Sequence, residues 1–243
     1  MMPVLYEAPV PLTPEAHGTK SLGTQADYFF AAQTNSVPLN GPEFPAAAQH
    51  YPIVFTAGAP LAAVAIVGLR PSENLFVDER GAWRADTYIP AYLRRYPFIF
   101  IQGASPTQFV LGVEEKSPLV VEGQQRPFFV DGKPTPLVDQ ALRFCSEFQS
   151  HYDATSEMCA ELERLDLLVN NRADAVLAGG QRTVLSGFRI IDENRLNSLR
   201  DEDFLTLRHR KWLGWIYCHL VSLGKWSVLG TLAAQSAGAK RVN

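Results

Sequence analysis

The sequence has no apolar run long enough to cross a membrane. A spanning helix needs about 20 apolar residues, whereas the longest apolar run covers only residues 59–69 and is interrupted by a proline and a glycine. Cysteine is also scarce, and the three cysteines can neither all pair nor form a typical metal site. They are Cys145, Cys159 and Cys218. Unpaired cysteines of this kind serve as small buried apolar side chains, which is typical of proteins in a reducing compartment. We therefore expect a soluble, cytoplasmic protein without a membrane span.

Neither basic nor acidic residues are in large excess. The 22 basic and 25 acidic residues give a net charge of −3, so the chain has no general attraction to nucleic acid. The one compact basic run covers residues 208–211, and on a helix such a run is a solvated face. Hydrophobic residues make up 47% of the chain and charged residues 19%, which is typical of a folded globular domain. We expect no nucleic-acid partner.

Glycine-rich phosphate loops and nucleophile elbows are missing as well. Gly58 and the Gly179–Gly180 pair stand outside both common nucleotide-binding patterns. A hydrolase nucleophile elbow requires a glycine two positions before the serine, and Ser186 lacks one. We expect no cofactor, and the sequence carries no recognisable catalytic nucleophile.

The first half of the chain is rich in strand signals. Residues 51–55 and 62–69 are apolar or β-branched and are bounded by glycine and proline, which predicts two buried strands in a hairpin. Pro90 and Pro97 bracket a one-turn helix. Further strands are predicted over residues 27–32, 98–102, 108–113 and 128–130.

Helical spacing begins at residue 136. It predicts two helices, over residues 137–152 and 158–168, separated near Thr155. A strand pair, a short helix around Leu196 and a long final helix follow. The strands are expected over residues 175–177 and 184–191. The final helix is expected to be capped by Ser198 at its start and to end at Gly224.

Strands and helices are therefore segregated along the chain rather than alternating. We predict the α+β class, with a mostly antiparallel sheet, segregated helices and a long C-terminal aromatic helix. The composition further predicts an extended N-terminal arm over residues 1–48, a single α+β domain over residues 49–229 and a flexible tail over residues 230–243.

Two adjacent arginines stand among tyrosines and form the strongest candidate binding site. Guanidinium forks beside phenols suit a carboxylate or phosphate ligand, such as a peptide terminus. The alternative is that one arginine pairs with a structural carboxylate such as Asp78 or Asp86. We expect the final helix to add aromatic walls to the same pocket. The predicted ligand-binding residues are Tyr88, Tyr92, Arg94, Arg95, Trp212 and Trp215.

Histidine offers two weaker candidate sites. His219 lies on an apolar helix face, where Asp192 or Glu193 could hold it as a general base or as a structural tie, and we expect the tie. His151 and Asp153 match half of a metal triad. On a helix, however, residues two apart point about 200° apart. We therefore expect no metal there.

Five separated segments together resemble the bacterial SapC-like family, and the resemblance extends over roughly residues 10–229. The segments are residues 51–55, 73–78, 88–98, 187–193 and 212–223. The resemblance implies a soluble protein with an accessory role in peptide or surface-protein handling. Members of the family stand in genomes beside flavin-dependent tryptophan halogenases and outer-membrane receptors. An ABC-transporter permease shares the family name, and the lack of a spanning segment argues against that assignment.

These observations lead to one main expectation and two rivals. We expect a non-catalytic accessory protein that binds a peptide or protein segment in surface-layer or outer-membrane protein systems. By the same resemblance its partner is an outer-membrane receptor or a component of a halogenase system. The first rival is a peptide-modifying enzyme that uses His219 with Asp192 or Glu193, or a metal at His151 and Asp153. The second is a structural subunit whose exposed aromatic residues form an oligomer interface.

Overall fold

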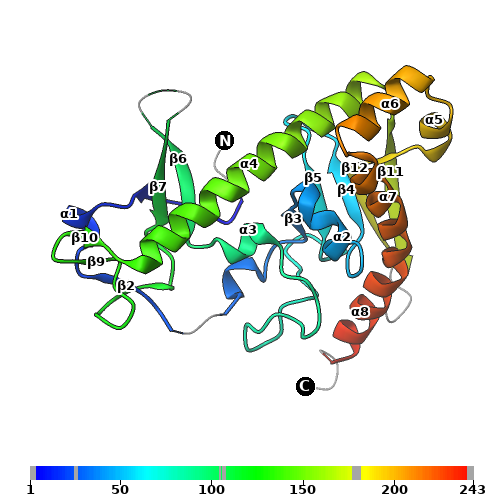
Figure 1. Ribbon diagram of the computed structural model, residues 1–243. Coiled ribbons are helices and arrows are strands. Elements are labelled where there is room, and N and C mark those ends of the chain that lie inside the picture. The colour runs from blue at the N-terminus through cyan, green and yellow to red at the C-terminus, as the bar shows by residue number, and fades with distance from the viewer. Residues whose placement is uncertain (1–3, 25–26, 104, 106–107, 177–181, 240–243) are drawn as a thin grey trace.

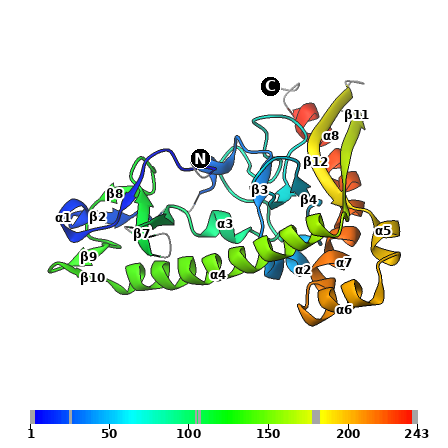
Figure 2. The same ribbon diagram turned by 90° about the horizontal axis from the view of Figure 1, so that it is seen from above.

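A single 29-residue helix, α4 (Pro136–Arg164), runs along the molecule and connects its two ends (Figure 1, Figure 2). At 1.5 Å per residue the helix is about 44 Å long. The computed structural model describes the chain except for residues 1–3, 25–26, 104, 106–107, 177–181 and 240–243. The expected turn at Gly179–Gly180 lies outside the described residues. None of the helices in the described part of the chain combines the length and the hydrophobicity that a membrane span requires.

An antiparallel five-stranded sheet forms one end of the molecule, in the order β11-β12-β4-β5-β3. The apolar hairpin of β4 and β5 lies in its centre and is almost completely buried, as the glycine-bounded apolar runs predicted. Helices α7 and α8 pack against β4, β11 and β12. The five strands are β3 (Ser36–Pro38), β4 (Ile53–Thr56), β5 (Ala63–Ile66), β11 (Leu168–Val176) and β12 (Arg182–Ile191).

A second, smaller β region covers the first half of α4 at the other end (Figure 1). Its three-stranded sheet has the order β1-β7-β6, and two strand pairs, β2-β8 and β9-β10, lie beside it. Phe98, Val113, Phe128 and Cys145 form its core. The strands are β1 (Pro9–Pro11), β2 (Lys20–Leu22), β6 (Phe98–Gln102), β7 (Phe109–Glu114), β8 (Val120–Glu122), β9 (Phe129–Val130) and β10 (Lys133–Pro134).

The N-terminal arm adds one strand to each of three sheets, because β1 pairs with β7, β2 with β8 and β3 with β5. Phe44 and Ala47 of the arm are completely buried in the main core. The strand expected over residues 27–32 is wrong. The Asp27 carboxylate accepts the N–H of Phe29 and starts a turn there instead. The arm's helical turns are α1 (Pro14–His17), η1 (Phe29–Ala31), η2 (Gly41–Glu43) and α2 (Phe44–Ala47).

Helix α4 is continuous where two helices were expected. The Thr155 hydroxyl donates to the carbonyl of His151 at 2.6 Å, and the Ser156 hydroxyl donates to the carbonyl of Tyr152 at 2.9 Å. Both side chains thereby bond within the helix instead of ending it. The helix ends before Asp166, whose φ is 52°, and β11 begins at Leu168, which we had placed in a helix.

Replacing Thr155 by valine is expected to lower the free energy of unfolding by about 2 kcal/mol. Besides its bond within α4, the Thr155 hydroxyl accepts the buried N–H of Gly41 at 2.8 Å and so joins η2 to the long helix. Valine keeps the shape but leaves that N–H without a partner. Urea denaturation measures the loss, with Ser156→Ala as the control, since Ser156 bonds only within α4. Equal stability of the two variants would contradict the role of Thr155.

The C-terminal aromatic segment is helical, as expected, but it consists of several helices. Lys211 has a φ of 63° and separates α6 from α7, which lets Trp212 turn into the core. Ser198 does not cap α6, because it follows the end of α5. Gly224 lies within η3, and the chain continues as α8, so residues 230–239 of the expected flexible tail are helical, with Leu232 buried. The helices are α5 (Glu193–Asn197), α6 (Asp201–His209), α7 (Leu213–Ser222), η3 (Leu223–Lys225) and α8 (Trp226–Ala239).

The fold class is confirmed as α+β with antiparallel sheets and segregated helices. The one-turn helix between the two prolines is also confirmed as α3 (Ala91–Arg94). It lies alongside the middle of α4 (Figure 1).

Candidate functional site

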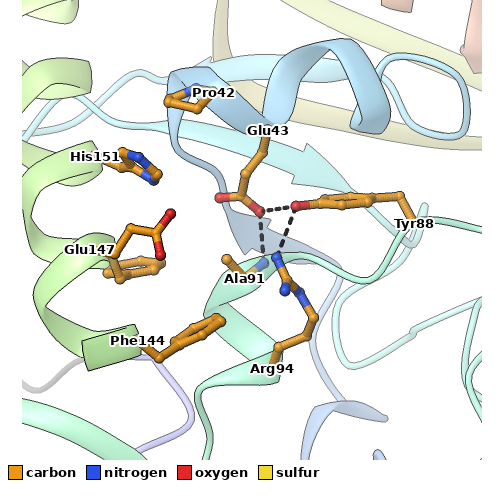
Figure 3. A pocket seen from close by; sticks show the side chains of 9 residues that line it. Pro42, Glu43, Tyr88, Ala91, Arg94, Phe144, Glu147 and His151 are labelled. Atoms are coloured by element: carbon orange, nitrogen blue, oxygen red, sulfur yellow. Dashed lines mark hydrogen bonds between the residues drawn. The ribbon is translucent and has the colours of Figure 1, made fainter. Parts of the chain in front are cut away.

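Two adjoining hollows lie between α3 and α4, and together we call them the α3–α4 groove. The first has a volume of about 210 Å³ and the second about 220 Å³. Arg94 and Phe144 line both hollows. In the first, Glu147 and His151 of α4 face Glu43 and Tyr88 (Figure 3).

Glu43 fixes the wall of the first hollow. Its carboxylate accepts the N–H of Asn40 at 2.9 Å, the hydroxyl of Tyr88 at 3.0 Å and the N–H of Ala91 at 2.7 Å. The first bond is half of a capping box at η2, and the last satisfies an N–H that the first turn of α3 leaves free. Glu43 is not among the site residues predicted from the sequence. The pattern Asn40-x-x-Glu43 was the signal that could have identified it.

Tyr88 and Arg94 extend this network (Figure 3). Nη2 of Arg94 donates to the Tyr88 hydroxyl at 3.2 Å, and Nε donates to the carbonyl of Ile89 at 3.0 Å. Burial, together with the negative charge of Glu43, raises the pKa of Tyr88 to about 12. The phenol therefore stays protonated and acts as a donor. The Arg94 guanidinium lies over Phe144, at 5.3 Å from the ring centre, and its side chain is exposed.

Arg95 lies between two aromatic rings. Its guanidinium carbon is 4.3 Å from the ring centre of Tyr92 and 4.2 Å from that of Phe148. Its Nε atom is buried and has no hydrogen-bond partner within the described part of the chain. Arg95 lines the second hollow together with Arg126, which is exposed and donates to the carbonyl of Gly23 at 3.3 Å.

The arginines of the groove have no carboxylate partner in the described part of the chain. Among the residues that the structure describes, no ion pair includes Arg94, Arg95 or Arg126. The alternative that an arginine pairs with Asp78 or Asp86 is therefore wrong. Asp78 instead accepts the backbone N–H groups of the turn that follows it. Arginines beside aromatic rings and without a counter-charge are suited to an anionic ligand.

A comparison with protein families shows to which family the chain belongs. The family model described as SapC matches residues 12–229. The chain belongs to the SapC family. Comparisons with curated proteins and with solved structures found no match for this SapC-family chain.

The aromatic walls of the SapC-family groove differ from those we expected. Tyr92 is buried, and its hydroxyl donates to the carbonyl of Val4 at 2.6 Å. Trp212 is buried as well, and neither Trp212 nor Trp215 lines either hollow. Trp215 packs behind η2, where a Cβ atom on Gly41 would lie 2.2 Å from its ring. Residues 88–98 and 209–219 thus contact opposite ends of η2. The aromatic wall that we expected from a tryptophan is instead formed by Phe144.

The catalytic alternative at His219 needs correction. The residue is completely buried; its Nε2 accepts the N–H of Ile191 at 3.0 Å, and its Nδ1 lies 2.9 Å from the carbonyl of Ile53. These partners require the tautomer that carries its proton on Nδ1. Asp192 caps α5 with its carboxylate, the ring partners of His219 are Ile191 and Ile53, and Glu193 is exposed. With both nitrogens bonded to the backbone, His219 has no atom left for substrate.

His151 and Asp153 also do not form a joint site. His151 lines the first hollow, whereas the exposed Asp153 accepts a hydrogen bond from Gln149 on the same helix, at 2.8 Å. The helical spacing turns the two side chains apart, as expected for residues two apart. Within the described ranges, no group of three or more histidine, cysteine or acidic side chains could hold a metal ion.

Proposed function

We propose that this SapC-family protein binds a peptide or protein segment in the α3–α4 groove and does so without catalysing a reaction. One observation carries the proposal, namely three guanidinium groups that line a groove with aromatic walls and have no carboxylate partner in the described chain. A free protein solvates such groups with water, and a ligand that supplies an anion beside apolar surface replaces this water favourably.

The nature of the lining side chains supports a binding role. Cys145 is the one thiol that lines the groove, and burial raises its pKa to about 11, although the charge of Arg95 opposes this shift. The thiol is therefore protonated at neutral pH and is a poor nucleophile. Tyr88 also stays protonated, and it is held by Glu43 and Arg94. Neither group is an activated nucleophile, and the donors that the groove presents to a ligand are the guanidinium N–H groups.

The proposal includes an accessory role in surface-layer or outer-membrane protein systems. The family supports this part, and an outer-membrane receptor or a halogenase-system component is the partner we propose on that basis. We also propose that the protein acts in the cytoplasm. The three cysteines, which are free in the structure, support a reducing compartment.

Selection of binding peptides from a display library tests the groove directly. Peptides selected on the wild-type protein should bind the double variant Arg94→Ala/Phe144→Ala at least about tenfold more weakly, because both hollows lose a wall. The matched control is Leu142→Ala/Arg143→Ala, which removes one arginine and one large apolar side chain from the exposed face of α4. Fluorescence anisotropy gives the affinities, and circular dichroism checks the fold. Unchanged affinity in the groove variant, or a selection without binders, would reject the proposal.

A further inference from the structure

The two hollows of the α3–α4 groove carry different charges. The second hollow is lined by Arg94, Arg95 and Arg126, and no acidic side chain lines it among the residues that the structure describes. The first hollow contains the exposed carboxylate of Glu147, for which the described residues provide no ion pair. A ligand that spans both hollows therefore meets a basic end and an acidic end.

The basic end also has an apolar lining. Leu137, Ala141, Phe144 and Phe98 line the second hollow beside the arginines. A small inorganic anion would satisfy the guanidinium groups but would leave this apolar surface in contact with water. A carboxylate attached to an apolar side chain would satisfy both, since arginine binds a carboxylate with two parallel hydrogen bonds. The last residue of a polypeptide, when its side chain is apolar, has this combination.

The distance between the two ends sets the spacing in the ligand. Ala141 in the second hollow and Glu147 in the first are six positions apart on α4, which corresponds to about 9 Å along the helix. An extended peptide covers this distance with about three residues. A lysine or arginine three positions before the end of the peptide would thus lie beside Glu147.

We infer that the α3–α4 groove binds the C-terminal end of a polypeptide, with the terminal carboxylate and an apolar last side chain in the second hollow and an upstream cationic side chain beside Glu147. This inference rests on the proposed function, and it adds the direction in which the peptide lies along α4. Arg126, which precedes β9, and Arg94, which ends α3, both line the second hollow and supply guanidinium groups for the carboxylate from separate segments of the chain.

Three labelled peptides test the inference. The first is acetyl-Ala-Lys-Ala-Ala-Leu with a free carboxylate, the second is its C-terminal amide, and the third carries glutamate in place of lysine. The wild-type protein should bind the first peptide about tenfold more tightly than the amide, because the amide removes the charge that the arginines bind. The glutamate peptide should bind about threefold more weakly than the first, since the pair with Glu147 is solvent-exposed.

Single variants assign each preference to one end of the groove. Arg126→Ala should reduce the preference for acid over amide, while Arg143→Ala, which replaces an exposed arginine on the outer face of α4, should retain it in full. Glu147→Gln should remove the preference for lysine over glutamate and leave the acid-over-amide preference in place. Retention of both preferences in both variants would overturn the inference.

Two further outcomes separate this inference from the proposed function. If acid and amide bind equally, and both are lost in Arg94→Ala/Phe144→Ala, the groove binds peptides but does not recognise their ends, and the inference fails alone. If neither binds while display-selected peptides bind in the groove, the inference also fails alone. Inorganic phosphate, titrated by itself, should bind more weakly than the acid peptide because it cannot cover the apolar lining. Equal affinity for phosphate would overturn the inference as well.

Discussion

Replacing His219 by leucine is expected to lower the free energy of unfolding by about 3 kcal/mol, because it leaves two buried backbone groups without hydrogen-bond partners. The imidazole lies between β4 and β12 and bonds the carbonyl of Ile53 on one side and the N–H of Ile191 on the other. Ser222, one turn further along α7, accepts the N–H of Ile53 at 2.9 Å. The histidine thus joins α7 to two strands of the main sheet.

The same residue should make the stability of the protein depend on pH. Burial lowers the pKa of His219 to about 4, although the hydrogen bond with Ile53 opposes the shift. Above pH 6.5 the imidazole is neutral in the folded and the unfolded chain, so its contribution is fully present. As the pH falls from about 6.5 to about 4, the unfolded chain binds a proton that the folded chain cannot, and up to about 3 kcal/mol of stability is lost.

Urea denaturation at neutral pH and at about pH 5 measures both effects. The wild-type protein should lose stability between the two conditions, and His219→Leu should start lower and lose less. His209→Leu, which alters an exposed histidine at the end of α6, is the control and should resemble the wild type in both respects. If His219→Leu keeps the wild-type dependence on pH, then another group titrates over this range and our assignment to His219 is wrong.

Elements with local sequence signals form as the sequence predicts, whereas elements that depend on distant partners differ from the prediction. The β4–β5 hairpin and α3 were predicted well because glycine, proline and apolar runs act over a few residues. The continuity of α4 was missed because Thr155 and Ser156 can either end a helix or bond within it. In the fold, the Thr155 hydroxyl also accepts the N–H of Gly41, which is 114 positions away in the sequence. Local propensity contains no information on such a partner.

In the candidate site, too, the residues with local sequence signals were predicted and those brought together by the fold were not. Tyr88, Arg94 and Arg95 were identified from their own neighbourhood in the sequence, and all three lie at the groove or in its wall. The opposite wall comes from α4, and nothing in the sequence indicates that Phe144 and Glu147 face α3. The tryptophans were assigned to the site because large aromatic residues are common in pockets, yet they are equally common in cores. Here they pack behind η2 and in the main core.

The second large effect is expected at Glu43, where substitution by alanine should lower the free energy of unfolding by about 4 kcal/mol. Glu43 is 6% exposed, and its carboxylate accepts three hydrogen bonds that join the arm, Tyr88 and the start of α3. Alanine leaves the buried N–H of Asn40 and the partly buried N–H of Ala91 without an acceptor. Glu43→Gln should cost about half as much, since an amide keeps one acceptor oxygen but turns its NH2 group toward one of the former donors.

Glu43 should affect ligand binding without contacting the ligand. Its bonds hold Tyr88 and the start of α3, and these in turn place Arg94 between the two hollows. Glu43→Gln, measured where it is still fully folded, should therefore bind the acetyl-Ala-Lys-Ala-Ala-Leu acid several-fold more weakly and retain the preference for acid over amide. Glu147→Gln is the matched comparison, because the same substitution on the exposed side of the groove should change lysine selectivity and leave the stability unchanged. If Glu43→Gln is destabilised but binds the peptide as well as the wild type, then the position of α3 does not control the groove. In that case the arginines would act through their charge alone.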